Sequence, residues 1–120
     1  MNCVTREQID AICSALPGAQ LALPPELVSW KVGGKMFACF GGEADMSGVS
    51  VKCPDVETAQ MLIDANEAVR APYFHKSWVR LPFDKTDPDY ATLRIGVSYD
   101  IIMKSLPKKL RATFPARKEA

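Results

Sequence analysis

The sequence predicts an α+β domain, an antiparallel twisted sheet of about five strands with helices on one face, in the order α-β-β-β-α-β(β)-α. Two observations carry this prediction. Apolar residues alternate on both sides of Gly33-Gly34, which is typical of a β-hairpin and makes the sheet antiparallel. Three other segments have apolar residues at helical spacing, and each needs an apolar surface to cover. The length of 120 residues fits one domain.

The first helix is expected to begin after Thr5, because the Thr5 hydroxyl can cap it while Gln8 reaches back to the cap backbone. Its apolar face has the spacing i, i+3, i+4 and i+7, at Ile9, Ile12, Cys13 and Leu16. Pro17-Gly18 ends this helix. Residues 19–23 are then expected to form a short strand, which Pro24-Pro25 closes.

The hairpin is expected over Leu27 to Phe40, with its turn at Gly33-Gly34 and Lys35 at the tip. A two-residue turn predicts three facing pairs on the core side, Val32 with Lys35, Trp30 with Phe37 and Val28 with Cys39. The opposite side of the sheet is then expected to carry Ser29, Lys31, Met36, Ala38 and Phe40.

A loop at 41–48 leads to the next strand, whose apolar residues alternate with Ser50 and Lys52 on the solvent side. Asp55 is expected to cap a second helix that runs to about Asn66. A connection through Pro72-Tyr73-Phe74 leads to a further strand, Lys76 to Leu81. In that strand Val79 and Leu81 are expected to point one way, and Trp78 and Arg80 the other.

Asp87-Pro88 places a capping acid before a proline at the first helical position, so the last helix is expected to begin there. We expect one helix through Gly96 to Leu106, where Pro107 stops it. Its apolar stripe is expected at Tyr90, Leu93, Val97 and Ile101, widened by Tyr99 and Ile102. Residues 1–107 are therefore taken as a single domain, and residues 108–120 as a basic, flexible tail.

Four segments of the chain, in this order, resemble the MmcQ/YjbR family of small bacterial proteins. They are Trp30-Lys31-Val32-Gly33-Gly34-Lys35-Met36-Phe37-Ala38, Val49-Ser50-Val51-Lys52-Cys53, Ala71-Pro72-Tyr73-Phe74 with Trp78-Val79, and Ser98-Tyr99 leading to Leu106-Pro107-Lys108-Lys109. The resemblance implies an α+β fold of the secretion-chaperone-like or frataxin-like type and a DNA-binding role. It brings no catalytic residues, and the first helix has only Glu7 and Asp10 of the acidic ridge that iron binding of the frataxin type would need.

Catalytic and metal-binding candidates are sparse. The four cysteines form no C-x-x-C pair, and the single histidine, His75, is remote from all of them in sequence. Asp84, Asp87 and Asp89 are expected to act as caps or solubilising charges rather than as cation ligands. We therefore expect no enzyme activity, no metal and no cofactor, and the role of His75 stays open.

The compartment follows from the amino terminus and the cysteines. Residues 1–7 show no basic segment followed by an apolar one, so no secretory signal is expected. No apolar run approaches the roughly 18 residues that a membrane span requires. We expect a cytoplasmic protein with reduced thiols and no membrane contact.

The net charge of +1 divides unevenly along the chain. Residues 104–120 hold six basic residues and one acid, a net +5, whereas the rest holds nine basic and thirteen acidic residues, a net −4. A basic end can neutralise phosphates, and cations beside aromatic rings suit nucleic-acid contacts. We therefore expect DNA binding through Lys31, Lys35, Lys52, Lys76, Trp78, Arg80, Lys104, Lys108, Lys109 and Arg111.

Two alternatives remain at this point. The basic end can be a solubilising tail. The open sheet face can instead serve a protein-interaction or adaptor module with no nucleic-acid role, because large apolar residues on an exposed sheet mark protein interfaces. That interface is expected to use Met36, Phe40 and Trp78, in a monomer or a weak homodimer.

Overall fold

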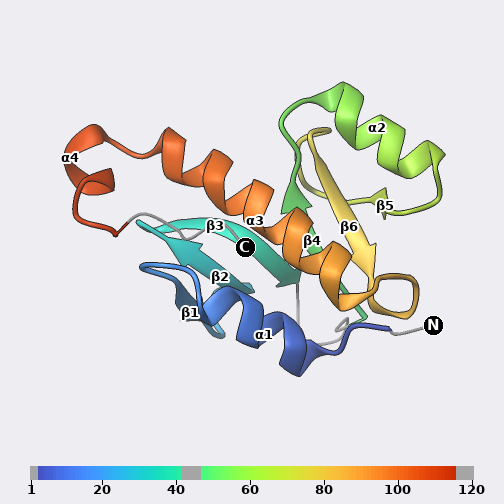
Figure 1. The fold of residues 1–120 in the computed structure, drawn as a ribbon, viewed down its shortest axis with the longest axis horizontal. Coiled ribbons are helices and arrows are strands. Elements are labelled where there is room, and N and C mark those ends of the chain that lie inside the picture. The colour runs from blue at the N-terminus through green and yellow to red at the C-terminus, as the bar shows by residue number, and fades with distance from the viewer. Residues whose placement is uncertain (1–2, 42–46, 116–120) are drawn as a thin grey trace.

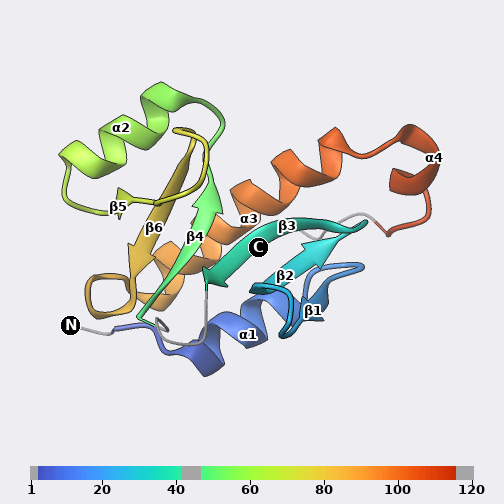
Figure 2. The same cartoon turned by 180° about the vertical axis from the view of Figure 1, so that it is seen from behind.

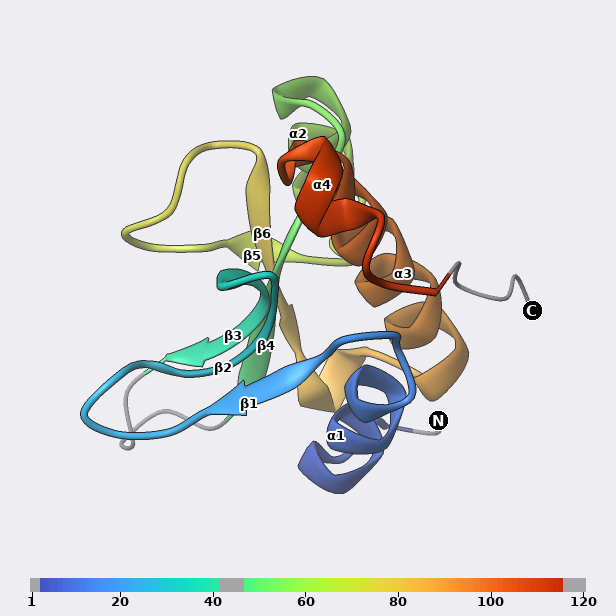
Figure 3. The same cartoon turned by 90° about the vertical axis from the view of Figure 1, so that its left-hand side faces the viewer.

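The computed structural model describes residues 3–41 and 47–115, and within them the strands form one antiparallel sheet in the order β1-β2-β3-β4-β6-β5. The strands are β1 (Gln20–Ala22), β2 (Val28–Val32), β3 (Lys35–Gly41), β4 (Gly48–Lys52), β5 (Val69–Arg70) and β6 (Trp78–Pro82). The helices are α1 (Arg6–Ser14), α2 (Val56–Asp64), α3 (Pro88–Ser105) and α4 (Lys108–Arg111), with a 3-10 turn η1 (Phe83–Lys85). All four helices lie on one side of the sheet (Figures 1 and 3), and Figure 2 looks onto the other, open face. The α+β prediction is confirmed.

The helix starts follow the predicted caps. At α1 the Thr5 hydroxyl accepts a hydrogen bond from the backbone N–H of Gln8 at 3.2 Å, and the Gln8 side chain accepts one from the Thr5 N–H at 2.9 Å. The carboxylates of Asp55 and Asp87 each accept from a backbone N–H three residues on, at the starts of α2 and α3. These local signals place the three long helices without any knowledge of the sheet.

The register of the hairpin departs from the prediction after the first pair. Val32 does pair with Lys35, but Trp30 pairs with Ala38 rather than Phe37, and Val28 pairs with Gly41 rather than Cys39. The register shifts twice between these pairs, so that β3 has an extra residue at each of two β-bulges. The alternation of the sequence could not reveal these bulges, because a bulge is defined only against the partner strand.

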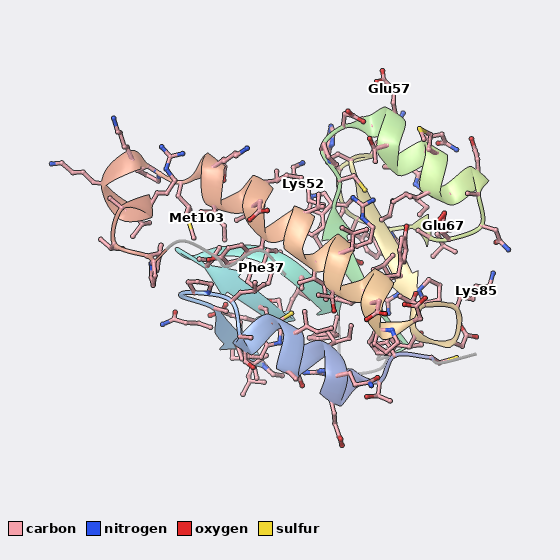
Figure 4. The ribbon with its side chains drawn as sticks, in the orientation of Figure 1. Phe37, Lys52, Glu57, Glu67, Lys85 and Met103 are labelled. Carbon is pink, nitrogen blue, oxygen red and sulfur yellow. The ribbon has the colours of Figure 1, made fainter. Side chains whose placement is uncertain are left out.

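The bulges also correct the assignment of faces in β3. Phe37 faces the helices as predicted (Figure 4), but Ala38 and Phe40 do so too and are wholly buried in the core, where the open face was expected. The guanidinium of Arg6 in α1 lies 3.7 Å from the centroid of the Phe40 ring. Cys39, expected in the core, lies instead on the open side, where it lines a hollow.

Helix α3 runs through Gly96 as one helix, as predicted, and Tyr99 and Ile102 are buried as expected, but the rest of its buried face differs from the predicted stripe. Leu93 of the predicted stripe is 58% exposed. The buried positions are Ala91, Ile95, Gly96, Ser98, Tyr99 and Ile102. Small side chains on this face let the helix backbone approach the sheet closely, so the larger apolar residues of the predicted stripe fall at its margins.

One hydroxyl of α3 enters the sheet itself. The ladder between β3 and β4 has two residue pairs, Ala38 with Val51 and Cys39 with Ser50. Just beyond it, Ser98 Oγ accepts a hydrogen bond from the Lys52 N–H at 2.9 Å and donates one to the Phe37 carbonyl at 2.6 Å. Ser98 thus bridges two strands at the point where their own pairing ends.

The region expected to be a tail begins with structure. Helix α4 starts directly after Pro107, and Phe114 packs against the core next to Gly18, where an added Cβ would lie 2.4 Å from the Phe114 ring. The expectation of an unstructured segment from residue 108 is therefore wrong for 108–115. Residues 116–120, with Arg117 and Lys118, lie outside the described residues, and their flexibility stays a prediction.

Candidate nucleic-acid interface

The turn of the β2–β3 hairpin packs against the end of α3 and the start of α4. Gly33 has φ of +57°, and a Cβ there would lie 2.7 Å from Leu106 and 3.2 Å from Leu110. Only a glycine allows both this backbone geometry and this approach. The Lys35 ammonium then reaches Ser105 at the end of α3, at 3.3 Å from its hydroxyl. The hairpin tip and the carboxyl-terminal helices therefore form one surface.

Five predicted cations gather on this surface, which we call the basic end. They are Lys35, Lys104, Lys108, Lys109 and Arg111. Lys104, Lys108 and Lys109 are exposed, and Arg111 extends back to the carbonyl of Lys104 at 3.4 Å. Figure 4 places Glu57 and Glu67 far from α4, around α2 and the loop after it. These two acids are thus separated from the basic end in space, whereas Asp100 lies on α3 four residues before Lys104.

Two other predicted cations, Lys31 and Arg80, make local contacts on the open face. The Lys31 ammonium forms an ion pair with Glu26 at 2.6 Å. The Arg80 guanidinium donates to the Phe40 carbonyl at 3.3 Å and lines a hollow on that face. Both side chains are half-buried, so they are less suited to phosphate contacts than the basic end.

Lys52 and His75 meet at a shared serine. The Lys52 ammonium donates to Ser77 Oγ at 2.7 Å, and Ser77 Oγ lies 2.9 Å from His75 Nδ1. The backbone N–H of Ser77 also donates to His75 Nδ1, at 3.1 Å. Because Ser77 is buried, this group secures the loop before β6 rather than presenting a nucleophile. The neighbouring Lys76 is exposed.

Trp78 has one face of its ring covered. The Phe74 ring stacks on it with a centroid separation of 4.7 Å and an interplanar angle of 29°. The predicted connection through residues 72–74 thus packs on Trp78, and the indole is half-buried. With Phe40 wholly buried as well, two of the three side chains expected for a protein interface are engaged within the domain, and Met36 is half-buried.

Burial keeps the thiols of Cys13 and Cys53 neutral, because it outweighs the nearby cations, Arg6 at Cys13 and Arg94 and Lys52 at Cys53. Burial raises the pKa of the Cys13 thiol far above its ordinary value, and nearby Asp10 raises it further. Burial likewise raises the pKa of Cys53. A thiol held in its neutral form is a poor nucleophile. Within residues 3–41 and 47–115, no group of three His, Cys, Asp or Glu side chains lies close enough to hold a metal ion.

The open face also carries a hollow that was not predicted from the sequence, lined in part by Arg70 and Tyr73. The motif Ala71-Pro72-Tyr73-Phe74 contributed to the family resemblance without being given a role. Residues 72–74 of this motif line the hollow because of the strand residues that lie opposite them. Sequence periodicity cannot predict which strand residues those are. In the part of the chain that the structure describes, no helix is long and apolar enough to cross a membrane.

Comparison with known proteins gives a family and a structural neighbour. A family model described as YjbR matches residues 14–101. The crystal structure of Deinococcus radiodurans protein DR2400, described with the family-model domain DUF419, has a TM-score of 0.76 and 22% sequence identity to this chain. The similarity covers 91% of this chain and 86% of that one, and at this identity it shows a shared fold. No curated protein matches the sequence.

Proposed function

The chain belongs to the YjbR family, and from that premise we propose that it is a non-catalytic protein that binds DNA through the phosphates, using its basic end. The observation that supports this proposal is the gathering of five cations from two distant parts of the chain on one surface. Three of these cations, Lys108, Lys109 and Arg111, belong to α4. The packing of Leu106 and Leu110 against Gly33 holds this helix in place on the hairpin turn.

The affinity is expected to be local and dependent on salt. Each phosphate neutralised by a lysine or arginine releases condensed counterions, so log K falls against log salt with a slope of about −0.9 per contact. Three to five contacts from the basic end therefore predict a slope of roughly −3 to −4.5. Contacts to phosphates alone carry little sequence preference, so binding is expected to differ little between duplexes of different sequence.

The experiment is a titration of a fluorescently labelled DNA duplex, followed by anisotropy at two salt concentrations. The variant Lys108→Glu/Lys109→Glu is expected to weaken binding by about 100-fold at the lower salt concentration, and to flatten the salt slope by about 2. Both side chains are exposed, so the fold is expected to tolerate the change.

The matched control is Lys76→Glu/Lys85→Glu, which changes the net charge by the same amount on two exposed lysines outside the basic end. It is expected to weaken binding by less than about threefold, through long-range electrostatics alone. Equal losses in the two variants would contradict a local site. An absence of binding at low salt would remove the DNA role altogether.

A further inference from the structure

A hollow of about 470 Å³ lies on the open face, away from the basic end. Its floor includes Cys39, Ser50 and Arg80, which face one another across β3, β4 and β6. Its walls come from Leu27 in the β1–β2 loop and from the β5–β6 loop, both of which project from the side of the sheet opposite the helices (Figure 3). This volume is within the range of small-molecule sites, roughly 300–1,000 Å³.

The lining combines apolar surface with positive charge. Leu27 is 48% exposed and Val69 is 40% exposed, so both have apolar area still open to a ligand. Arg70 and Arg80 line the same hollow, and none of the described residues that line it is acidic. Arg80 already donates to the Phe40 carbonyl, whereas Arg70 is exposed at the edge strand β5. A ligand that complements this lining has an apolar body and one anionic group near Arg70.

Tyr73 stands at the lip of the hollow, at the third position of a turn that follows Pro72 and that the Phe74 N–H closes onto the Ala71 carbonyl at 3.4 Å. Its φ is +72°, in the left-handed region that favours glycine, and its side chain is fully exposed. The ring therefore gains no burial in return for its unfavourable backbone. A fully exposed aromatic ring on this turn, beside an apolar hollow, is placed to cover the apolar body of a ligand.

The wall that carries Tyr73 is anchored rather than loose. Phe74 stacks on Trp78, and Ser77 is held by both Lys52 and His75. A wall fixed by these contacts exists before any ligand arrives, so little ordering entropy opposes binding.

We propose that this hollow binds a small molecule in which an aromatic or aliphatic body carries one carboxylate, with Arg70 pairing with the carboxylate and Tyr73 covering the apolar body. A second copy of the chain fits the site less well. A two-fold interface through this face would bring the arginines of one copy towards those of the other. The proposal is independent of DNA binding, because it uses none of the basic-end residues.

The test uses 2-naphthoate and its neutral counterpart 2-naphthamide, which differ in the anionic group, titrated into the full chain and followed by amide chemical shifts in NMR. We expect saturable one-to-one binding of 2-naphthoate with a Kd of about 1 mM, as suits a ligand of this size. The shifts are expected at Ser50, at residues 69–71, and at Tyr73 and Phe74; Pro72 has no amide N–H. 2-Naphthamide is expected to bind about tenfold more weakly.

Two variants separate the two contacts. Arg70→Gln is expected to weaken 2-naphthoate about tenfold and to leave 2-naphthamide unchanged. Tyr73→Gly is expected to weaken both compounds equally, by about threefold, while keeping or raising Tm, because glycine suits the backbone there. Lys109→Gln, at the basic end, is the control and is expected to change neither affinity.

The proposal is overturned by any of three results: no saturation, equal affinity for the two compounds, or shifts outside the hollow. Insensitivity to both Arg70→Gln and Tyr73→Gly also overturns it. None of these results bears on the DNA proposal, which the Lys108→Glu/Lys109→Glu variant tests at a separate surface.

Discussion

The two faces of the sheet are made from neighbouring residues of the same strands, yet they differ in kind. On the helix side, Phe37, Val51 and Val79 are wholly buried. On the open side, Lys52 and Arg80 of the same strands are half-buried and hold their charges through local hydrogen bonds. The comparison suggests that stability resides mainly on the helix side, and that the open side is available for contacts with other molecules.

The largest expected effect comes from Phe37→Ala on the helix side. The Phe37 ring is buried and meets the Tyr99 ring edge to face at a centroid distance of 5.3 Å. Removing it should lower the free energy of unfolding by about 3–5 kcal/mol, measured by urea denaturation. Val69→Ala on the open side is the counterpart and should cost less than about 1 kcal/mol. Similar losses in the free energy of unfolding for Phe37→Ala and Val69→Ala would contradict the view that stability resides mainly on the helix side.

A smaller effect is expected from the buried hydroxyls. Ser98→Ala removes the partner of two backbone groups, the Lys52 N–H and the Phe37 carbonyl, and should cost about 2–3 kcal/mol. Ser29→Ala, at an equally buried serine, removes a hydrogen bond to the Leu27 carbonyl and should cost about 1 kcal/mol. The difference in denaturation midpoint between the two variants measures how much the Ser98 hydrogen bonds between α3 and the sheet contribute to stability. Equal midpoints would contradict this contribution of the Ser98 hydrogen bonds.

The smallest effect concerns the thiols, where the expected result is a difference in labelling rate. With a thiol reagent at pH 8, exposed Cys3 should react first, Cys39 on the open side later, and Cys13 and Cys53 only on unfolding. Because burial raises the pKa of Cys13 and Cys53 in the folded state, their contribution to stability is full below the ordinary thiol pKa of 9.0 and declines as the pH rises above it. Rapid native labelling of Cys13 or Cys53, seen by mass spectrometry, would contradict their placement.

Local signals in the sequence were sufficient for most of the elements. The cap at Thr5, the proline at position 88 and the turn at Gly33-Gly34 act over a few residues, so they can be read without the rest of the fold. The bulges of β3 depend on β2, and the buried face of α3 depends on how closely it approaches the sheet. Because of these tertiary features, Phe40 is buried and Leu93 is exposed, the opposite of what the sequence predicted.

The candidate sites show the same division. The basic end was predictable in part, because four of its five cations lie within eight residues of one another, and only Lys35 required the fold to bring it there. The hollow was not predictable, since Leu27, Cys39 and Tyr73 converge from three separate segments. The periodicity of apolar residues predicts which face of one helix or strand is buried. A hollow depends on how several segments are arranged in space.

The short ladder between β3 and β4 makes the sheet a pair of three-stranded ribbons, β1-β2-β3 and β4-β6-β5, joined along a narrow seam. Helix α3 lies across both ribbons and closes the seam with Ser98. The two ribbons are therefore tied to each other by α3 as well as by their own short ladder. We therefore expect substitutions on the buried face of α3, at Ser98 above all, to alter the floor of the hollow without touching any residue that lines it.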